Sequence, residues 1–143
     1  MAPHIVRRRY AGSHPYRGLR WTGPPPAAVS WLASPRPLRL YCARSFAARW
    51  LGLRWWPDWG RQPRGLLFPG CGAVHTLGLA ADIDLVFLDA DGRILAAVPE
   101  IPSGRLVWRR RARAVIELPA GYCARTDWRA QVDAAVRARK IVV

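Results

Sequence analysis

Short apolar runs, several of them alternating with polar residues, recur between residues 38 and 118. A period of two, combined with β-branched and aromatic residues, is typical of strands. On this basis the sequence predicts strands at residues 38–43, 65–68, 83–89, 93–98, 105–108 and 112–118. The third and fourth of these are joined by DADG at residues 89–92, a tight-turn sequence that predicts a hairpin.

Two other segments show a helical period. Phe46, Trp50 and Leu53 are spaced i, i+4, i+7 behind Ser45, a residue type that favours the N-cap position. A second apolar stripe in residues 126–140 is formed by Trp128, Val132, Ala135 and Val136. We therefore expect an α+β fold that is mainly β. It would be a small antiparallel curled sheet or partly open barrel, with one short helix after the first strand and one C-terminal helix.

Residues 1–36 differ from the rest of the chain in composition. They mix Pro, Gly, Ser and Arg without a strand or helix period, as in GPPP at residues 23–26. Such a segment buries too little apolar surface to offset the entropy lost on ordering. We expect a disordered or loosely docked Pro/Arg-rich extension at residues 1–36 and a single domain at residues 37–143.

The sequence shows no feature of a membrane or secreted protein. No apolar stretch approaches the ~18–20 residues of a membrane span, and no signal-peptide pattern follows the N-terminal arginines. The three cysteines, Cys42, Cys71 and Cys123, contain no C-x-x-C pair. An odd count is more typical of reduced, mostly buried thiols than of a disulfide framework. We therefore expect a cytoplasmic protein that does not bind a membrane.

The formal net charge is +14, and 22 of the 23 basic residues are Arg. The charge is uneven, because residues 82–100 carry five acidic residues and one Arg. The densest basic cluster is Arg109, Arg110, Arg111 and Arg113, which follows Trp108. Arginine binds phosphate and an indole can stack on a base, so the cluster could support weak, non-specific nucleic-acid binding. No nucleic-acid-binding motif accompanies it, and a run of charges is more often a solvated surface.

Cys71, His75 and Asp84 are the candidates for catalysis. A thiol, an imidazole and a carboxylate are the residue types of a nucleophile, its base and the group that orients the base. Cys71 and His75 are also metal-ligand types, but a zinc site needs three or four ligands and no further Cys or His lies near in sequence. The alternative, which we favour, is a buried Cys with a His that bonds the backbone. No cofactor is predicted, and a metal is not expected.

The acidic residues near residue 84 have simpler interpretations. Asp84 opens an apolar strand, which favours hydrogen bonds to turn amides, with a buried ion pair to Arg49 as the alternative. Asp89 and Asp91 flank the predicted hairpin turn. DADG shares its first positions with a calcium loop but lacks the later ligands, so turn chemistry is the favoured interpretation.

The motifs resemble a known family. GLLFPGC at residues 65–71, VHT at 74–76, IDLVFLD at 83–89 with Gly92, and VIELPAG at 115–121 are similar to the bacterial and archaeal family catalogued as domain of unknown function 192. Arg49, Gly52 and Leu53 fit its upstream motif. The resemblance covers about residues 38–122. It implies a β-rich fold and no particular activity.

These observations favour a small, non-catalytic binding or accessory module for an unknown protein or small ligand. Trp55, Trp56 and Trp59, in a segment rich in Pro and Gly, are candidates for an exposed contact patch, or could instead fold back over the sheet. Two alternatives remain: an enzyme that uses Cys71, His75 and Asp84 or a metal, and a weak nucleic-acid binder that uses the Arg109–Arg113 cluster.

Overall fold

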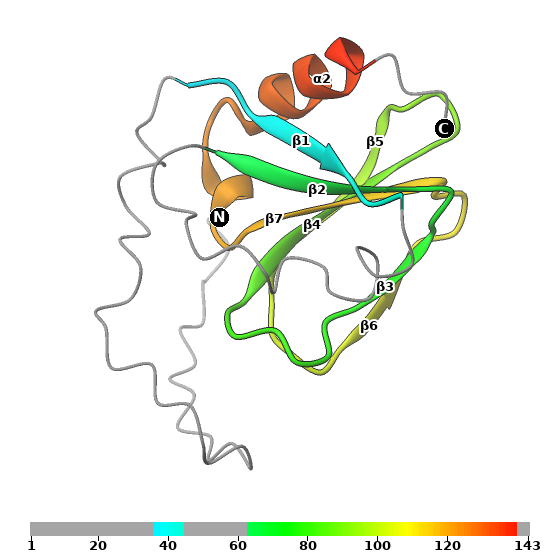
Figure 1. The fold of residues 1–143 in the computed structure, drawn as a ribbon, viewed down its shortest axis with the longest axis vertical. Helices are drawn as coiled ribbons and strands as arrows, with labels where there is room; N and C mark the ends of the chain where they lie inside the picture. Colours follow the sequence, from blue (N-terminus) through cyan, green and yellow to red (C-terminus); the bar gives the residue numbers. More distant parts are fainter. Residues whose placement is uncertain (1–35, 45–62, 140–143) are drawn as a thin grey trace, which may run out of the picture.

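A computed structural model of the chain describes residues 36–44 and 63–139. Within these ranges the fold consists of strands, one short 3-10 helix and one α-helix (Figure 1). The strands are β1 (Arg39–Cys42), β2 (Arg64–Pro69), β3 (Ala73–His75), β4 (Ile83–Leu88), β5 (Ile94–Ile101), β6 (Leu106–Trp108) and β7 (Ala114–Pro119). The helices are η2 (Tyr122–Ala124) and α2 (Trp128–Ala138).

Five of the strands form one mixed sheet in the order β1-β2-β7-β4-β5. The pairs β2–β7, β7–β4 and β4–β5 are antiparallel, as expected, but β1 and β2 are parallel. A parallel pair needs a long connection, and residues 43–63 supply it. The predicted mainly β fold is therefore confirmed, whereas the purely antiparallel pairing is corrected, because the sheet is mixed; it is not closed into a barrel.

The remaining strands, β3 and β6, form a separate antiparallel ribbon and pair with no other described strand. β3 was not among the predicted strands, since three residues are too few to show a period. In Figure 1 the ribbon lies on one side of the five-stranded sheet and α2 lies on the other. The sheet is therefore covered on both faces.

Alternation along β4 explains how both faces form a core. Val86 and Leu88 pack with α2 in one cluster, whereas Leu85 and Phe87 pack in a second cluster that includes Val74 of the ribbon. All six residues of β4 are buried. Each fully buried Leu or Phe side chain contributes about 1.5–3 kcal/mol, so this interior strand stabilises both layers. Because both faces of β4 are packed against apolar residues, its sequence does not alternate between apolar and polar residues.

The predicted C-terminal segment contains α2, with Val132, Ala135 and Val136 buried against the sheet. Asp127 occupies the N-cap position, but its side chain caps no backbone N–H group. Its carboxylate instead accepts hydrogen bonds from Arg125 at 2.8 and 2.9 Å and from Gln131 at 3.1 Å. The helix predicted at residues 45–53 lies outside the described residues, as do residues 1–35. No helix in the described part is long and apolar enough to cross a membrane.

Candidate binding surface on a two-stranded ribbon

Asp84 is fully buried on the face of the sheet that α2 covers. Its Oδ1 accepts hydrogen bonds from the backbone N–H groups of Glu100 at 2.9 Å and Gly121 at 3.2 Å, and its Oδ2 accepts one from Cys123 at 2.7 Å. These donors match the predicted backbone-amide interaction, although they come from distant segments. Through these hydrogen bonds, the carboxylate connects β4 to the end of β5 and to the segment around η2. The proposed partner Arg49 lies outside the described residues.

The thiol of Cys123 interacts with Asp84. Burial, the negative charge of Asp84 and a side-chain hydrogen bond to it raise the pKa of the Cys123 thiol to about 12, with burial the largest effect. A thiol is a nucleophile only as the thiolate. Cys123 is therefore protonated at neutral pH and acts as a hydrogen-bond donor to Asp84. Sequence analysis missed this contact, because the two residues are far apart along the chain.

Cys71 and His75 lie on the other side of the sheet from Asp84. Cys71 is half-buried, packs with the cluster beneath the ribbon, and donates a hydrogen bond from Sγ to the carbonyl oxygen of Ala73 at 2.8 Å. His75 is exposed on β3. Because β4 separates the two clusters, the structure does not bring Cys71, His75 and Asp84 together. Cys71, which sequence analysis expected to be buried, is half-buried, as are Cys42 and Cys123.

The described residues contain no group of three or more His, Cys, Asp or Glu side chains arranged to hold a metal ion. In the hairpin turn, Asp89 Oδ1 accepts hydrogen bonds from the N–H groups of Asp91 and Arg93, both at 2.9 Å. These bonds are the turn chemistry that the DADG sequence favours. Asp89 therefore has a local structural role.

The outer surface of the β3–β6 ribbon is exposed. Ala73 pairs with Trp108 and His75 pairs with Leu106, so these four side chains share one face, which we call the ribbon face. The alternate pair, Val74 and Val107, points toward the core. Leu106 is 65% exposed and Trp108 is 64% exposed. Large apolar side chains exposed side by side are characteristic of interaction surfaces.

The free edge of β6 has backbone groups that the ribbon does not use. Thr76 N–H bonds the carbonyl oxygen of Arg105 at 2.8 Å, and Arg109 N–H bonds that of Gly72 at 3.0 Å. In an antiparallel pair only alternate residues point their backbone groups at the partner. Leu106 and Trp108 therefore direct theirs to the outer edge, where the Trp108 carbonyl oxygen accepts a 2.9 Å hydrogen bond from the guanidinium of Arg109. A shallow pocket of about 230 Å³ runs along this edge and is lined by Leu106, Val107, Trp108 and Arg109.

Buried Thr76 fixes the position of β6. Its Oγ1 donates to the carbonyl oxygen of Pro102 at 2.7 Å and accepts from the N–H of Arg105 at 2.9 Å. Its own carbonyl oxygen accepts from Ser103 Oγ and from the N–H of Gly104, both at 3.1 Å. The loop between β5 and β6 is thus tied to the end of β3. These hydrogen bonds therefore hold in place the strand that carries Leu106 and Trp108 of the ribbon face.

The predicted arginine cluster forms the turn between β6 and β7. Arg109, Arg110, Arg111 and Arg113 are all exposed. The guanidinium of Arg109 lies 5.6 Å from the centre of the Phe87 ring and donates a 2.9 Å hydrogen bond to the carbonyl oxygen of Trp108. Positive charge therefore lies next to the ribbon face. The other predicted contact residues, Trp55, Trp56 and Trp59, lie outside the described residues.

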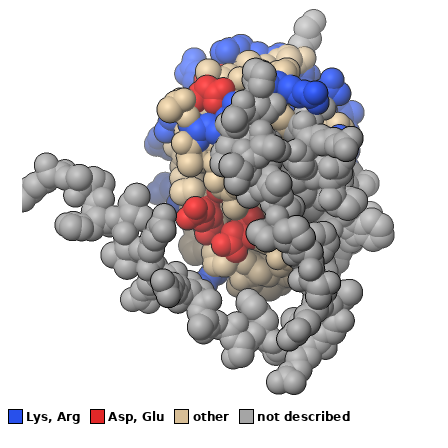
Figure 2. Space-filling model, turned by 90° about the vertical axis from the view of Figure 1, so that its left-hand side faces the viewer, with Lys and Arg blue, Asp and Glu red and all other residues tan. Residues whose placement is uncertain are grey.

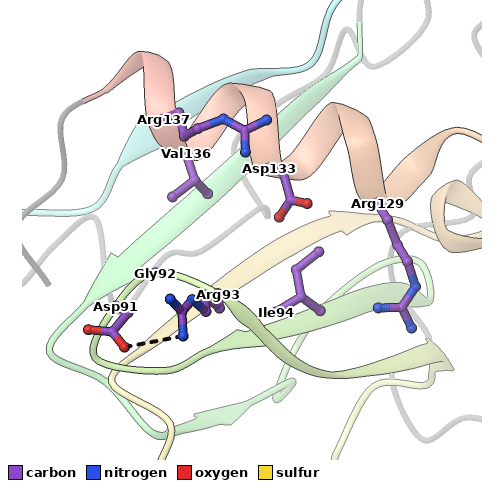
Figure 3. A pocket seen from close by; sticks show the side chains of 8 residues that line it. All are labelled: Asp91, Gly92, Arg93, Ile94, Arg129, Asp133, Val136 and Arg137. Carbon is purple, nitrogen blue, oxygen red and sulfur yellow. Dashed lines mark ion pairs between the residues drawn. The ribbon is translucent and has the colours of Figure 1, made fainter.

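A second, more polar pocket lies between α2 and the β4–β5 turn (Figure 3). Its volume is about 450 Å³. It is lined by Asp91, Gly92, Arg93, Ile94, Arg129, Asp133, Val136 and Arg137. In Figure 2, Lys and Arg side chains gather around the α2 end of the molecule. Sequence analysis did not identify this pocket, because its arginines come from two segments with different periods.

The fold is similar to that of solved structures. One is a protein of unknown function from Novosphingobium aromaticivorans DSM 12444, with 21% identity and a TM-score of 0.53 over 62% of this chain and 67% of that one. Another is a candidate transcription regulator from Sinorhizobium meliloti 1021, with 21% identity and a TM-score of 0.50 over 57% and 68%. At this identity the similarity shows a shared fold alone. A comparison with curated proteins finds no match.

A family model described as DUF192, Uncharacterized ACR, matches residues 30–134. The match covers most of the chain and spans every described strand. It includes the segments that carried the resemblance in the sequence: GLLFPGC, VHT, IDLVFLD and VIELPAG. The resemblance is therefore confirmed, and the chain belongs to the uncharacterised DUF192 family.

Proposed function

We propose that this domain is a non-catalytic binding module that uses the ribbon face and the free edge of β6 to hold an extended, acidic segment of a partner protein. The observation that carries the proposal is the exposure of Leu106 and Trp108 on a strand whose outer edge pairs with no other strand among residues 36–44 and 63–139. An extended peptide could add to this edge as a third strand, which is a common mode of peptide recognition.

The chemistry of the candidate catalytic residues supports a non-catalytic role. A thiol nucleophile needs a base within about 2.6–3.2 Å and a group that orients the base. Asp84 lies on the opposite side of the sheet from Cys71 and His75, and its carboxylate is occupied by backbone amides. Cys123, the thiol that does contact Asp84, is kept protonated by a pKa raised to about 12.

Charge and side-chain type indicate the class of partner. Exposed Arg109, Arg110 and Arg111 follow directly after Trp108, so a segment bound along β6 would meet positive charge at one end. Trp and Arg are also the residue types that most often dominate binding energy in protein interfaces. An extended segment with apolar and acidic residues complements this surface.

A protein partner fits the ribbon face better than a nucleic acid. A single-stranded nucleic acid is held by a row of aromatic rings on which successive bases stack. The ribbon face has two rings, the indole of Trp108 and the imidazole of His75, which are separated by the aliphatic Leu106 and by Ala73 rather than arranged in a row. Arg109 also directs a guanidinium N–H group to the chain's own backbone.

The three cysteines bear on where such a module would work. None forms a disulfide in this structure, although all three are only half-buried. Half-buried thiols persist in a reducing compartment, which supports a cytoplasmic location. Oxidation of the purified protein in air, followed by mass spectrometry, checks whether the thiols are accessible: intermolecular disulfides are expected without reductant and would be absent if the thiols were protected.

The test uses a labelled ten-residue peptide of alternating Glu and Val, with a Lys–Val peptide and a ten-residue oligo-dT as comparisons. Fluorescence anisotropy at low salt should show binding of the Glu–Val peptide that weakens as salt rises. The double variant Leu106→Ser, Trp108→Ala should abolish binding. Leu95→Ser is the matched control, because Leu95 is an exposed leucine on β5, outside the ribbon face.

Three outcomes would contradict the proposal. They are absence of Glu–Val binding at low salt, equal binding of the Lys–Val peptide, and equal loss in the Leu95→Ser control. Tighter binding of oligo-dT that is lost when Arg110 and Arg111 are changed to Gln would instead favour the nucleic-acid alternative.

A further inference from the structure

The polar pocket between α2 and the β4–β5 turn, which we call the α2 pocket, has an unusual arrangement of charge. Arg129 and Arg137 come from the helix, and Arg93 comes from the turn (Figure 3). Asp133 lies between the two helical arginines, four residues from each, so all three share one helix face. The pocket therefore combines hydrogen-bond donors from two elements with carboxylate acceptors.

The lining has three guanidinium groups and two carboxylates, and few of them form ion pairs with described residues. Among the residues that the structure describes, the one ion pair in the pocket joins Arg93 to Asp91 at 3.8 Å, with side chains 79% and 71% exposed. Ion pairs between side chains this exposed contribute little to the stability of the fold. The guanidinium of Arg129 lies 4.6 Å from the centre of the Trp128 ring, which orients its plane. A guanidinium has five N–H donors, so ample donor capacity remains for a ligand.

The backbone at Gly92 determines how the two elements meet. Gly92 has φ +74°, and a Cβ atom added there would lie 3.4 Å from Val136 Cγ1. A larger residue would thus be both strained and in contact with the helix. The positive φ is therefore the reason for a glycine in the turn that precedes Arg93. Arg93 lines the same cavity as Arg129 and Arg137, with Ile94 and Val136 as apolar walls.

We propose that the α2 pocket binds a phosphate monoester of a polyol, such as a sugar phosphate. Arginine pairs bidentately with phosphate, so a guanidinium group at one end of the pocket would hold the phosphate, and an arginine at the other end would donate to the hydroxyl groups. Asp133 and Asp91 would accept hydrogen bonds from hydroxyl groups, and the apolar walls would contact the carbon skeleton. The volume of about 450 Å³ lies in the range of about 300–1,000 Å³ typical of small-molecule sites.

A polyol phosphate accounts for the pocket better than inorganic phosphate does. The carboxylates of Asp91 and Asp133 would repel a free dianion, whereas hydroxyl groups on the ligand give them donors. The site is separate from the ribbon face, so its failure would leave the proposed peptide-binding function unaffected.

The experiment is calorimetry on the full chain with ribose 5-phosphate, ribose and inorganic phosphate as separate probes. Ribose 5-phosphate should bind more tightly than either of the others. Arg129→Gln and Arg137→Gln should each weaken its binding by about tenfold or more, since hydrogen bonds to charged groups are the strong ones. Arg139→Gln is the matched control, because Arg139 is exposed at the end of the same helix and does not line the pocket.

Asp133→Ala separates the two parts of the proposal. It should weaken binding of ribose 5-phosphate, because an acceptor for the hydroxyls is lost, and strengthen binding of inorganic phosphate, because a repelling charge is removed. Stronger binding of both probes would overturn the polyol assignment. Inorganic phosphate binding as tightly as the ester would also overturn the polyol assignment, and equal weakening by Arg139→Gln would overturn the site altogether.

Discussion

Asp84 stands where an apolar residue would be expected, because every other residue of β4 is apolar and buried. Its charge is tolerated because three backbone N–H groups and the Cys123 thiol donate to it. A buried carboxylate without such donors would be strongly destabilising. Asp84 therefore connects β4 to the end of β5 and to η2. The position of η2 in turn brings α2 onto the sheet.

Changing Asp84 to Asn should destabilise the fold by about 2–4 kcal/mol, because an amide cannot replace a carboxylate that accepts from several donors. Urea unfolding followed by circular dichroism measures the change. Asp82→Asn, at an exposed neighbouring position, should stay within about 0.5 kcal/mol of the unmodified chain. Equal midpoints for Asp84→Asn and Asp82→Asn would show that the donors contribute nothing.

Cys123 should react slowly with alkylating reagents in the folded protein. At pH 8 a pKa of about 12 leaves about 1 thiolate in 10,000, against about 1 in 10 for the ordinary pKa of 9.0. The stronger intrinsic nucleophilicity of a high-pKa thiolate offsets part of this difference, so the expected slowing is at least ~30-fold. Iodoacetamide labelling followed by mass spectrometry, with and without urea, tests it. Equal rates in both conditions would contradict the raised pKa.

At the scale of elements, the sequence predicts most of the described strands and the C-terminal helix. Those elements have either a clear period or, for β4, a β-branched run followed by a turn signal. Two features could not be predicted from it. The parallel pairing of β1 and β2 depends on where a long connection returns the chain, and β3 is too short to show a pattern.

The candidate site shows the same division. Local chemistry was predictable, because the Asp89 turn and the exposed arginine turn depend on neighbouring residues. The convergence of residues that are distant in sequence was not predictable, because strand order and register in the sheet determine which side chains come into contact. Cys71 and Asp84 are thirteen positions apart yet lie on opposite faces, whereas Asp84 and Cys123 are in contact. The pairing of His75 with Leu106 likewise depends on the register of β3 with β6.

The start of α2 should depend on pH through Asp127. Hydrogen bonds from Arg125 and Gln131 lower the pKa of Asp127 from 3.8 to about 2, with that of Arg125 the largest effect. A lowered folded-state pKa contributes stability above pH ~4, and this contribution is lost as the pH falls toward 2. The side chain of Asp127 is 42% exposed, so we expect less than about 1 kcal/mol.

A double-mutant cycle of Asp127→Asn and Arg125→Gln measures this contribution. Urea unfolding at pH 7 should give a favourable coupling between the two residues, and the coupling should vanish near pH 2. A coupling that is unchanged at the lower pH would mean that the carboxylate charge does not stabilise the helix start.

At the scale of the whole molecule, the five-stranded sheet separates two surfaces with different chemistry. The ribbon on one side presents exposed apolar residues beside an arginine turn, whereas the α2 side holds a polar pocket between a helix and a hairpin. The core clusters on the two faces are distinct. Substitutions on the ribbon face and in the α2 pocket should therefore act independently on stability and on binding.

The central claim is that β6 is an open edge that can accept another strand. Amide hydrogen exchange of the free protein, followed by NMR, tests this directly. The N–H groups of Leu106 and Trp108 should exchange rapidly, whereas those of Val107 and Arg109, which lie at positions bonded within the ribbon, should be protected. Addition of the Glu–Val peptide should slow exchange at Leu106 and Trp108. Protection of these two amides in the free protein, equal to that of Val107, would show that the edge is already covered and would contradict the account.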